Sequence, residues 1–198
     1  MELLKPPTAS DLSELVRELA GLYVGHPDKL QIRFQEAKDG SVYFAMRGTP
    51  EDDSRLIGTK GCHVDALKFL IGEIGAAQGR AFTFRLLSTP GSRGQWYPPR
   101  DVLDYDPIPA RDLLRRILSA LGVAEFSVEV NPGSGPRESL FFEFEVKIPD
   151  GKIAADLTIG EEDEISVIGA IGTLFRAIAK TNGVRFQVRL ADRVVAKE

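Results

Sequence analysis

The chain has 198 residues, of which 43% are hydrophobic and 27% charged, with a net charge of −4. This apolar content can build packed cores, so extensive disorder is excluded, and the length suits one large domain or two small ones. The negative charge argues against strong non-specific binding to duplex nucleic acid, which depends on neutralising phosphates. One cysteine excludes an intramolecular disulfide, and without a signal-peptide region or a membrane-length apolar run we expect a cytoplasmic protein with no membrane partner.

The first half of the chain predicts the element order α-β-β-α-α-β. Thr8 and its neighbours offer helix N-caps, and leucine and valine then recur at helical spacing as far as Leu22. Two strands with alternating apolar residues follow, over 30–35 and 42–47, joined by an Asp-Gly turn. A short helix, a glycine turn, a longer helix from about residue 63 and a strand over 82–86 complete the unit.

The second half repeats this order. Its apolar patterns predict a helix over 113–121, strands over 126–130 and 140–146, and a final strand over 184–190. Before a second glycine turn we expect an extra hairpin strand through 153–157 and a short helix over 161–168; another helix follows the turn over 173–180.

The sequence therefore predicts an α+β fold of two tandem units, each with a three-stranded sheet covered by helices. The expected domains are residues 1–87 and 110–198, and a linker rich in Pro, Gly, Ser and Asp spans 88–109. Charge divides the halves: residues 1–100 hold 13 Lys and Arg against 12 Asp and Glu, a net of +1. The remainder hold 12 against 17, a net of −5.

Both halves contain a Gly-x-x-Gly motif in a similar apolar setting. The first reads Gly58-Thr59-Lys60-Gly61 (GTKG) and the second reads Gly169-Ala170-Ile171-Gly172 (GAIG). A short glycine turn between two helices can bring the backbone against a nucleic-acid strand, because glycine has no Cβ and the following helix N-terminus favours anions. Lys60 adds a positive charge to the first turn, and a single-stranded partner is favoured over a duplex.

The second motif departs from this pattern. It has no charged residue in the turn, and the acidic run 161–164 precedes it, so we expect this unit to bind RNA poorly or not at all. An exposed Ile171 at the turn would instead pack against the first unit or against another chain.

The run from Asp53 to Lys68 resembles a KH domain, because it follows the family core I-G-x-x-G-x-x-I/V with a lysine between the glycines. The element order is similar to the type II, prokaryotic arrangement, as in KhpA-like bacterial KH proteins and the KH module of Jag-type proteins. Residues 10–87 carry this likeness well, and 110–191 resemble a degenerate second copy.

The resemblance implies a non-catalytic protein that holds about four nucleotides of single-stranded RNA. The apolar side of the site would be lined by Leu56, Ile57, Val64 and the nearby sheet. The predicted RNA-contacting residues are Arg55, Ile57, Gly58, Thr59, Lys60, Gly61, His63, Val64 and Lys68.

Other functions have less support. An alternative is that the fold serves protein assembly, as a homodimer or within a ribonucleoprotein. Asp52 and Asp53 begin a helix and are interpreted as solvated caps rather than catalytic carboxylates, and the adjacent Cys62 and His63 do not have metal-ligand spacing. We therefore expect no catalysis, metal or cofactor. Trp96 and the aromatic and basic residues near it could stack bases or pin the linker to a domain.

Overall fold

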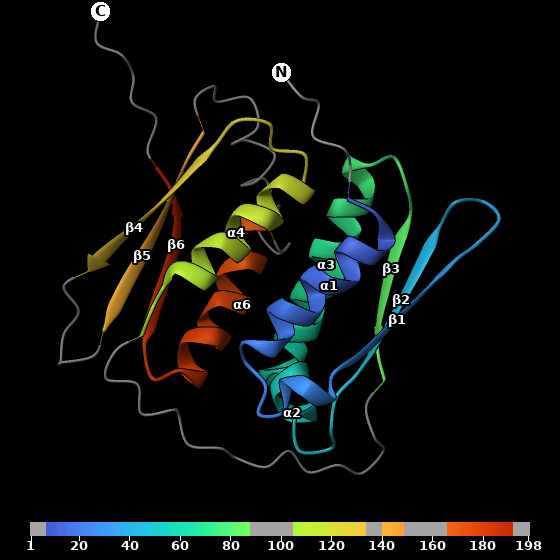
Figure 1. Ribbon diagram of the computed structural model, residues 1–198, viewed down its shortest axis with the longest axis horizontal. Helices are drawn as coiled ribbons and strands as arrows, with labels where there is room; N and C mark the ends of the chain where they lie inside the picture. The colour runs from blue at the N-terminus through green and yellow to red at the C-terminus, as the bar shows by residue number, and fades with distance from the viewer. Residues whose placement is uncertain (1–6, 88–104, 134–139, 149–165, 192–198) are drawn as a thin grey trace, which may run out of the picture.

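A computed structural model describes residues 7–87, 105–133, 140–148 and 166–191 (Figure 1). The fold is α+β, with two three-stranded mixed sheets and helices. The first unit contains α1 (Ala9–Gly21), β1 (Gln31–Glu36), β2 (Val42–Arg47), α2 (Asp53–Ile57), α3 (Cys62–Ala77) and β3 (Phe82–Leu86). The second contains α4 (Ile108–Ala120), β4 (Ser127–Gly133), β5 (Phe141–Lys147), α6 (Val167–Thr181) and β6 (Arg185–Leu190).

The two sheets have the same topology, which confirms the predicted repeat of strands. In the order β1-β2-β3 the first pair is antiparallel and the second parallel, and the order β4-β5-β6 has the same pattern. A parallel pair requires a crossover, which α2 and α3 supply in the first unit and the segment containing α6 supplies in the second. Phe82 lies opposite Val42, and Phe186 lies opposite Phe142 in the equivalent position.

The first helix forms where the sequence predicts it. Thr8 is the N-cap of α1, and its side chain and that of Asp11 make a reciprocal capping box with the backbone. The apolar residues at helical spacing, among them Leu12, Leu15 and Leu19, are buried. This buried face sets the helix against the core, with β1 as its neighbour in the sheet.

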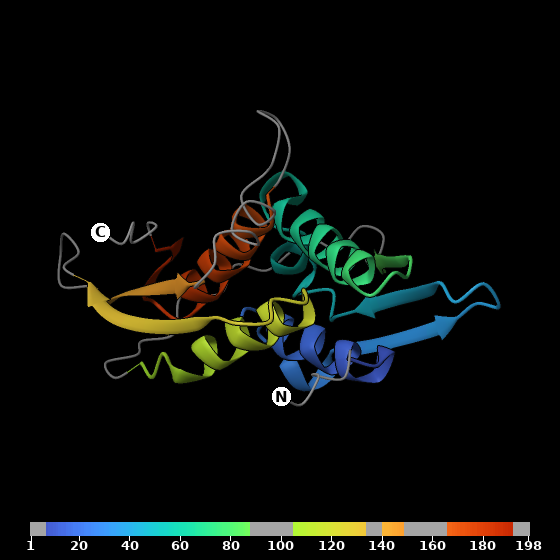
Figure 2. The ribbon, with the colours of Figure 1, turned by 90° about the horizontal axis from the view of Figure 1, so that it is seen from above.

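The molecule is built in four layers, with a sheet on each outside and the helices between them (Figures 1 and 2). Helices α1 and α3 cover the inner face of one sheet, and α4 and α6 cover the inner face of the other. The outer faces of the two sheets therefore point in opposite directions. None of the helices in the described segments has the length and apolar character needed to cross a bilayer.

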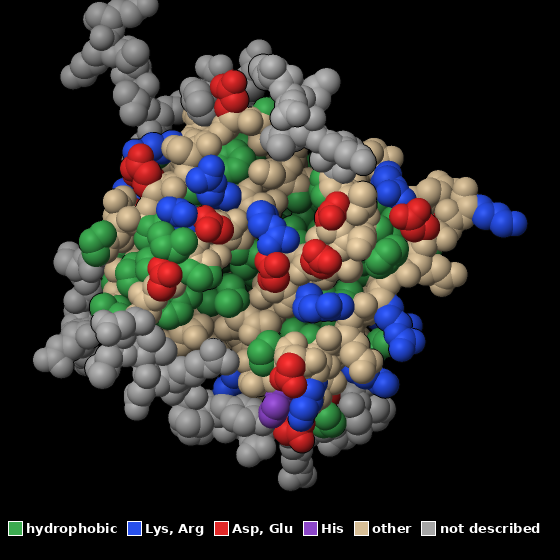
Figure 3. All heavy atoms as spheres, in the orientation of Figure 1, with side chains coloured by type: hydrophobic (Ala, Val, Ile, Leu, Met, Phe, Trp, Pro, Cys, Tyr) green, Lys and Arg blue, Asp and Glu red, His purple; other side chains and the backbone are tan. Residues whose placement is uncertain are grey.

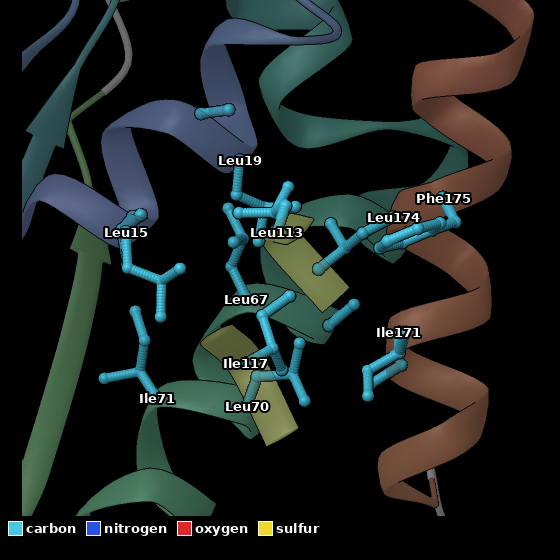
Figure 4. Packing of buried hydrophobic residues seen from close by; sticks show 14 of the residues in the cluster. Leu15, Leu19, Leu67, Leu70, Ile71, Leu113, Ile117, Ile171, Leu174 and Phe175 are labelled. Carbon is cyan, nitrogen blue, oxygen red and sulfur yellow. The ribbon is translucent and has the colours of Figure 1, made fainter. Parts of the chain in front are cut away.

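The helical layers of the two units share one hydrophobic core. Helix α3 packs on α6 and α1 packs on α4, so the buried apolar side chains of both units form a single cluster. Figure 4 shows this contact, which includes Leu15, Leu19, Leu67, Leu70, Ile71, Leu113, Ile117, Ile171, Leu174 and Phe175. Burying a side chain of this kind stabilises the fold by about 1.5–3 kcal/mol, so each unit stabilises the other.

Polar contacts also join the units near the C-terminal end of α6. The buried Asn182 side chain donates Nδ2–H to the carbonyl oxygens of Leu22, at 3.3 Å, and Ile178, at 2.8 Å. The Thr181 hydroxyl donates to the carbonyl oxygen of Tyr23 at 3.2 Å. The end of α6 is thereby held against the segment that follows α1.

The second Gly-x-x-Gly motif is not a turn, so this prediction is wrong. Gly169 and Gly172 lie inside α6, which begins at Val167 with Ser166 as its N-cap, and neither glycine has a positive φ. Ile171 is fully buried in the shared core rather than exposed. The helix continues through the motif because an unbroken apolar stripe packs it against α3.

Some predictions fall outside the described residues. These are the hairpin strand over 153–157, most of the short helix over 161–168, and the linker aromatic residues Trp96 and Tyr97.

Candidate nucleic-acid interface

The first Gly-x-x-Gly motif forms a tight loop between α2 and α3. Its backbone includes a short 3₁₀ turn, Thr59–Gly61, and φ is +75° at Gly58, +54° at Lys60 and +87° at Gly61. Lys60 is the sole non-glycine residue in the described chain with a positive φ, a conformation that costs an L-residue roughly 1–2 kcal/mol. The side chains of Thr59 and Lys60 at the tip of the loop are exposed.

Position 58 requires glycine for two reasons, its positive φ and the close approach of the His63 ring. A Cβ atom at this position would lie 2.5 Å from Cγ of the His63 ring. The imidazole therefore fills the inner side of the loop, and the glycine makes room for it.

His63 joins the two helices that flank the loop. Its Nδ1 lies 2.6 Å from the carbonyl oxygen of Arg55, and because a carbonyl only accepts, Nδ1–H is the donor. Burial lowers the pKa of His63 below its usual value of 6.5, partly offset by this hydrogen bond, and the charge of Lys180 lowers it further. The ring is half-buried and packs edge-on against Tyr23, so it positions the loop as a neutral group.

The loop opens directly onto the N-terminus of α3. Gly61 is the N-cap of this 16-residue helix and supplies no side-chain cap, so the first-turn amide groups retain no side-chain acceptor at the cap. An N-terminus of this kind attracts anions. The Asp65 carboxylate opposes this attraction, because one of its oxygens lies 3.1 Å from where a Cβ on Gly61 would be.

The predicted cations differ in their surroundings. Lys60 is exposed at the loop tip, and Arg55 is half-buried at the end of α2. Lys68 forms an ion pair with Asp65 at 3.1 Å, with both side chains about half exposed. A fourth cation, Lys180, comes from α6 and lies close enough to His63 to affect its pKa. No sequence signal near the loop indicates Lys180, because only the packing of α6 on α3 brings it there.

The three apolar residues predicted to line the site differ in burial. Ile57 and Val64 are half-buried on either side of the loop, where a bound strand can reach them. Leu56 is completely buried, so the prediction that it lines the site is wrong. A helix of five residues turns one side to the core, and Leu56 occupies that side.

Asp52 and Asp53 are both buried rather than solvated, so the interpretation of these two residues as solvated caps is wrong. Asp52 shows how the burial is compensated. Its carboxylate accepts hydrogen bonds from the backbone N–H groups of Gly25, at 2.6 Å, and His26, at 3.1 Å, and from the Thr49 hydroxyl at 3.1 Å. These bonds replace the hydration lost on burial. Asp52 thus fixes the start of α2, and with it the loop, to the segment after α1.

Comparisons with known proteins add nothing to this geometry. No protein-family model matches the chain, and a search of curated proteins finds no similar sequence. Within the described segments, no three His, Cys, Asp or Glu side chains are grouped so that they could hold a metal ion.

Proposed function

We propose that the protein binds single-stranded RNA, without catalysis, at the loop Gly58–Gly61 and the first turn of α3. The observation that carries the proposal is the exposed, strained loop tip. Thr59 and Lys60 project where three positive-φ residues bring the backbone to the surface, directly at a helix N-terminus. Such a surface combines close backbone approach, amide donors and one mobile ammonium group, which together suit a sugar-phosphate chain.

In this proposal the phosphates and the bases contact different residues. A phosphate lies at the amide groups of the first turn of α3, with Lys60 beside it. Ile57 and Val64, half-buried next to the loop, offer apolar contacts to the bases. Lys180 adds positive charge to the same region, whereas Lys68 is already paired with Asp65. With so few cations, each contributing a slope of about −0.7, affinity should depend only weakly on salt.

The second unit has no equivalent loop in the described residues. Gly169 and Gly172 of its Gly-x-x-Gly motif are helical and Ile171 is internal, so we assign no RNA contact to this motif. The burial of Ile171 also removes one of the two features that motivated the alternative of protein assembly; the other is the acidic charge of the second half.

The single cysteine provides a direct test of the proposed site. Cys62 is exposed at the first position of α3, next to the loop, so its reaction with a thiol reagent reports on access to that surface. We expect a short oligouridylate to slow this reaction in the native protein but not in the Thr59→Asp/Lys60→Asp variant. Equal reaction rates with and without saturating RNA would refute binding at the loop.

A further inference from the structure

The outer face of the β1–β2–β3 sheet is basic and uncompensated. Strand pairing places eight outward-facing residues in three rows across the sheet. None of these positions is acidic, and no ion pair joins their three arginines to any residue in the described segments. The face consists of Gln31, Arg33, Gln35, Tyr43, Ala45, Arg47, Thr83 and Arg85.

The arginines are grouped around one small residue. Arg33 and Arg85 lie directly opposite Ala45 on its two sides, so their backbones are about 10 Å apart. Arg47 is two residues along the same strand as Ala45, at about 7 Å. All three side chains are exposed, and in Figure 3 Lys and Arg side chains lie along the right-hand margin, where Figure 1 places this sheet.

An aromatic ring completes the surface. Tyr43 lies two residues before Ala45 on β2, on the other side of it from Arg47, and is 52% exposed. Its neighbours across the strands are Gln35 and Thr83, which are polar and uncharged, so one side of the ring is free of bulky apolar residues. An exposed ring beside several guanidinium groups is an arrangement suited to base stacking together with phosphate contacts.

The equivalent face of the second sheet carries charges of both signs. Three glutamates lie on its described strands, and two of the three cations there are paired with them: Lys147 forms ion pairs with Glu129 and Glu145, and Arg189 with Glu143 and Glu145. The two faces have the same strand order, so topology alone does not require a basic surface. Among the described residues, all three arginines on the first face are without acidic partners, whereas on the second face only Arg185 is.

We infer that this outer face binds single-stranded RNA as a second site, separate from the Gly58–Gly61 loop. The three arginines contact successive phosphates, and Tyr43 stacks on an unpaired base. A simple polyanion would satisfy the arginines but not the ring, whereas a base-paired duplex does not offer a free base face. The inference does not depend on the loop, because the helices lie on the other face of this sheet.

The charge contribution is tested with full-length protein and a labelled oligouridylate of about 12 nucleotides. In the Arg33→Gln/Arg47→Gln/Arg85→Gln variant we expect at least about tenfold weaker binding and a salt slope smaller by about 2. The control Arg17→Gln/Arg115→Gln/Arg185→Gln removes the same charge from exposed positions elsewhere, and its affinity should change less than about threefold. Equal losses in the two variants would overturn the inference.

The ring is tested by replacing Tyr43 with Ser, an exposed change with little effect on the core. Binding of oligouridylate should weaken about 5- to 100-fold, whereas binding of an abasic oligonucleotide of equal length should not change. An equal loss with both ligands, or no loss with either, contradicts base stacking.

The two proposed sites are separated by combining these variants. Thr59→Asp/Lys60→Asp should leave the effect of Tyr43→Ser intact, and the arginine variant should leave RNA protection of Cys62 intact. If Cys62 is never protected but the arginine variant still loses affinity, the loop proposal fails and the sheet site stands. The reverse pattern overturns the sheet site alone.

Discussion

The ring of His63 occupies the space that a side chain on Gly58 would need, with its Cγ 2.5 Å from the position of a Cβ there. The two residues lie on opposite sides of the loop tip in the sequence and form one packed unit in the structure. Because the loop is shaped from inside by this contact and by the hydrogen bond to Arg55, its outer surface is free to meet a ligand without rearrangement.

Replacing Gly58 with Ala should destabilise the protein by about 2–4 kcal/mol, because it combines an unfavourable positive φ with displacement of the His63 ring. The control is Gly79→Ala, where φ is +65° but no atom lies within 4 Å of the added Cβ. That variant should lose only about 1–2 kcal/mol. Urea denaturation measures both, and equal losses would show that the ring contact costs nothing.

Lys60→Gly should separate stability from RNA binding. Glycine adopts φ +54° without strain, which stabilises the folded state. Its greater freedom in the unfolded chain offsets part of this gain, so the free energy of unfolding should rise by up to about 1 kcal/mol. RNA affinity should fall because the ammonium group is lost. Thr59→Gly is the matched control, because Thr59 has no positive φ and should lose about 0.5–1 kcal/mol instead. A destabilised Lys60→Gly protein would argue that the strain is absent in solution.

The lowered pKa of His63 predicts a loss of stability in mild acid. Burial depresses the pKa in the folded protein, so below about pH 6.5 the unfolded chain binds a proton that the folded chain resists. His63 should therefore contribute no pH dependence to the free energy of unfolding above about pH 6.5, and the free energy should decline as the pH falls towards the folded-state pKa. Urea titrations of the native protein and His63→Gln should converge as the pH falls, and parallel curves would contradict the assignment.

The shared core predicts that the two units unfold together. Ile171→Ala removes a fully buried side chain at the contact of α6 with the first unit and should cost about 2–5 kcal/mol. Hydrogen exchange should then accelerate in α3 as well as in α6. Faster exchange confined to the second unit would show that the units are independently stable.

The sequence was a good guide to the strands and the first helix. Alternation over 30–35 and 42–47 and the stripe from Leu12 to Leu19 correspond to elements that the structure contains, because each is set by a local periodic pattern. It was a poor guide to packing between the units, since the contact of α3 with α6 joins residues about a hundred positions apart.

The second glycine motif shows why a short motif misleads. In α6 the buried residues Val167, Ala170, Ile171, Leu174, Phe175 and Ile178 recur at helical spacing straight through both glycines. That periodicity was present in the sequence and outweighs the similarity to the first motif, where no such stripe crosses the turn. For the site, the exposure of Thr59 and Lys60 followed from the motif, but the burial of Asp52 and the approach of Lys180 depend on tertiary contacts.

The most direct test is the affinity of a labelled, short oligouridylate for Thr59→Asp/Lys60→Asp, measured by fluorescence anisotropy. The control is Arg115→Asp/Ser119→Asp, which makes the same charge change at exposed positions of α4. The loop proposal predicts that the first variant loses affinity and that RNA no longer protects its Cys62 from a thiol reagent. The second variant should keep both the affinity and the protection. Equal affinity and equal Cys62 protection in both variants would contradict it.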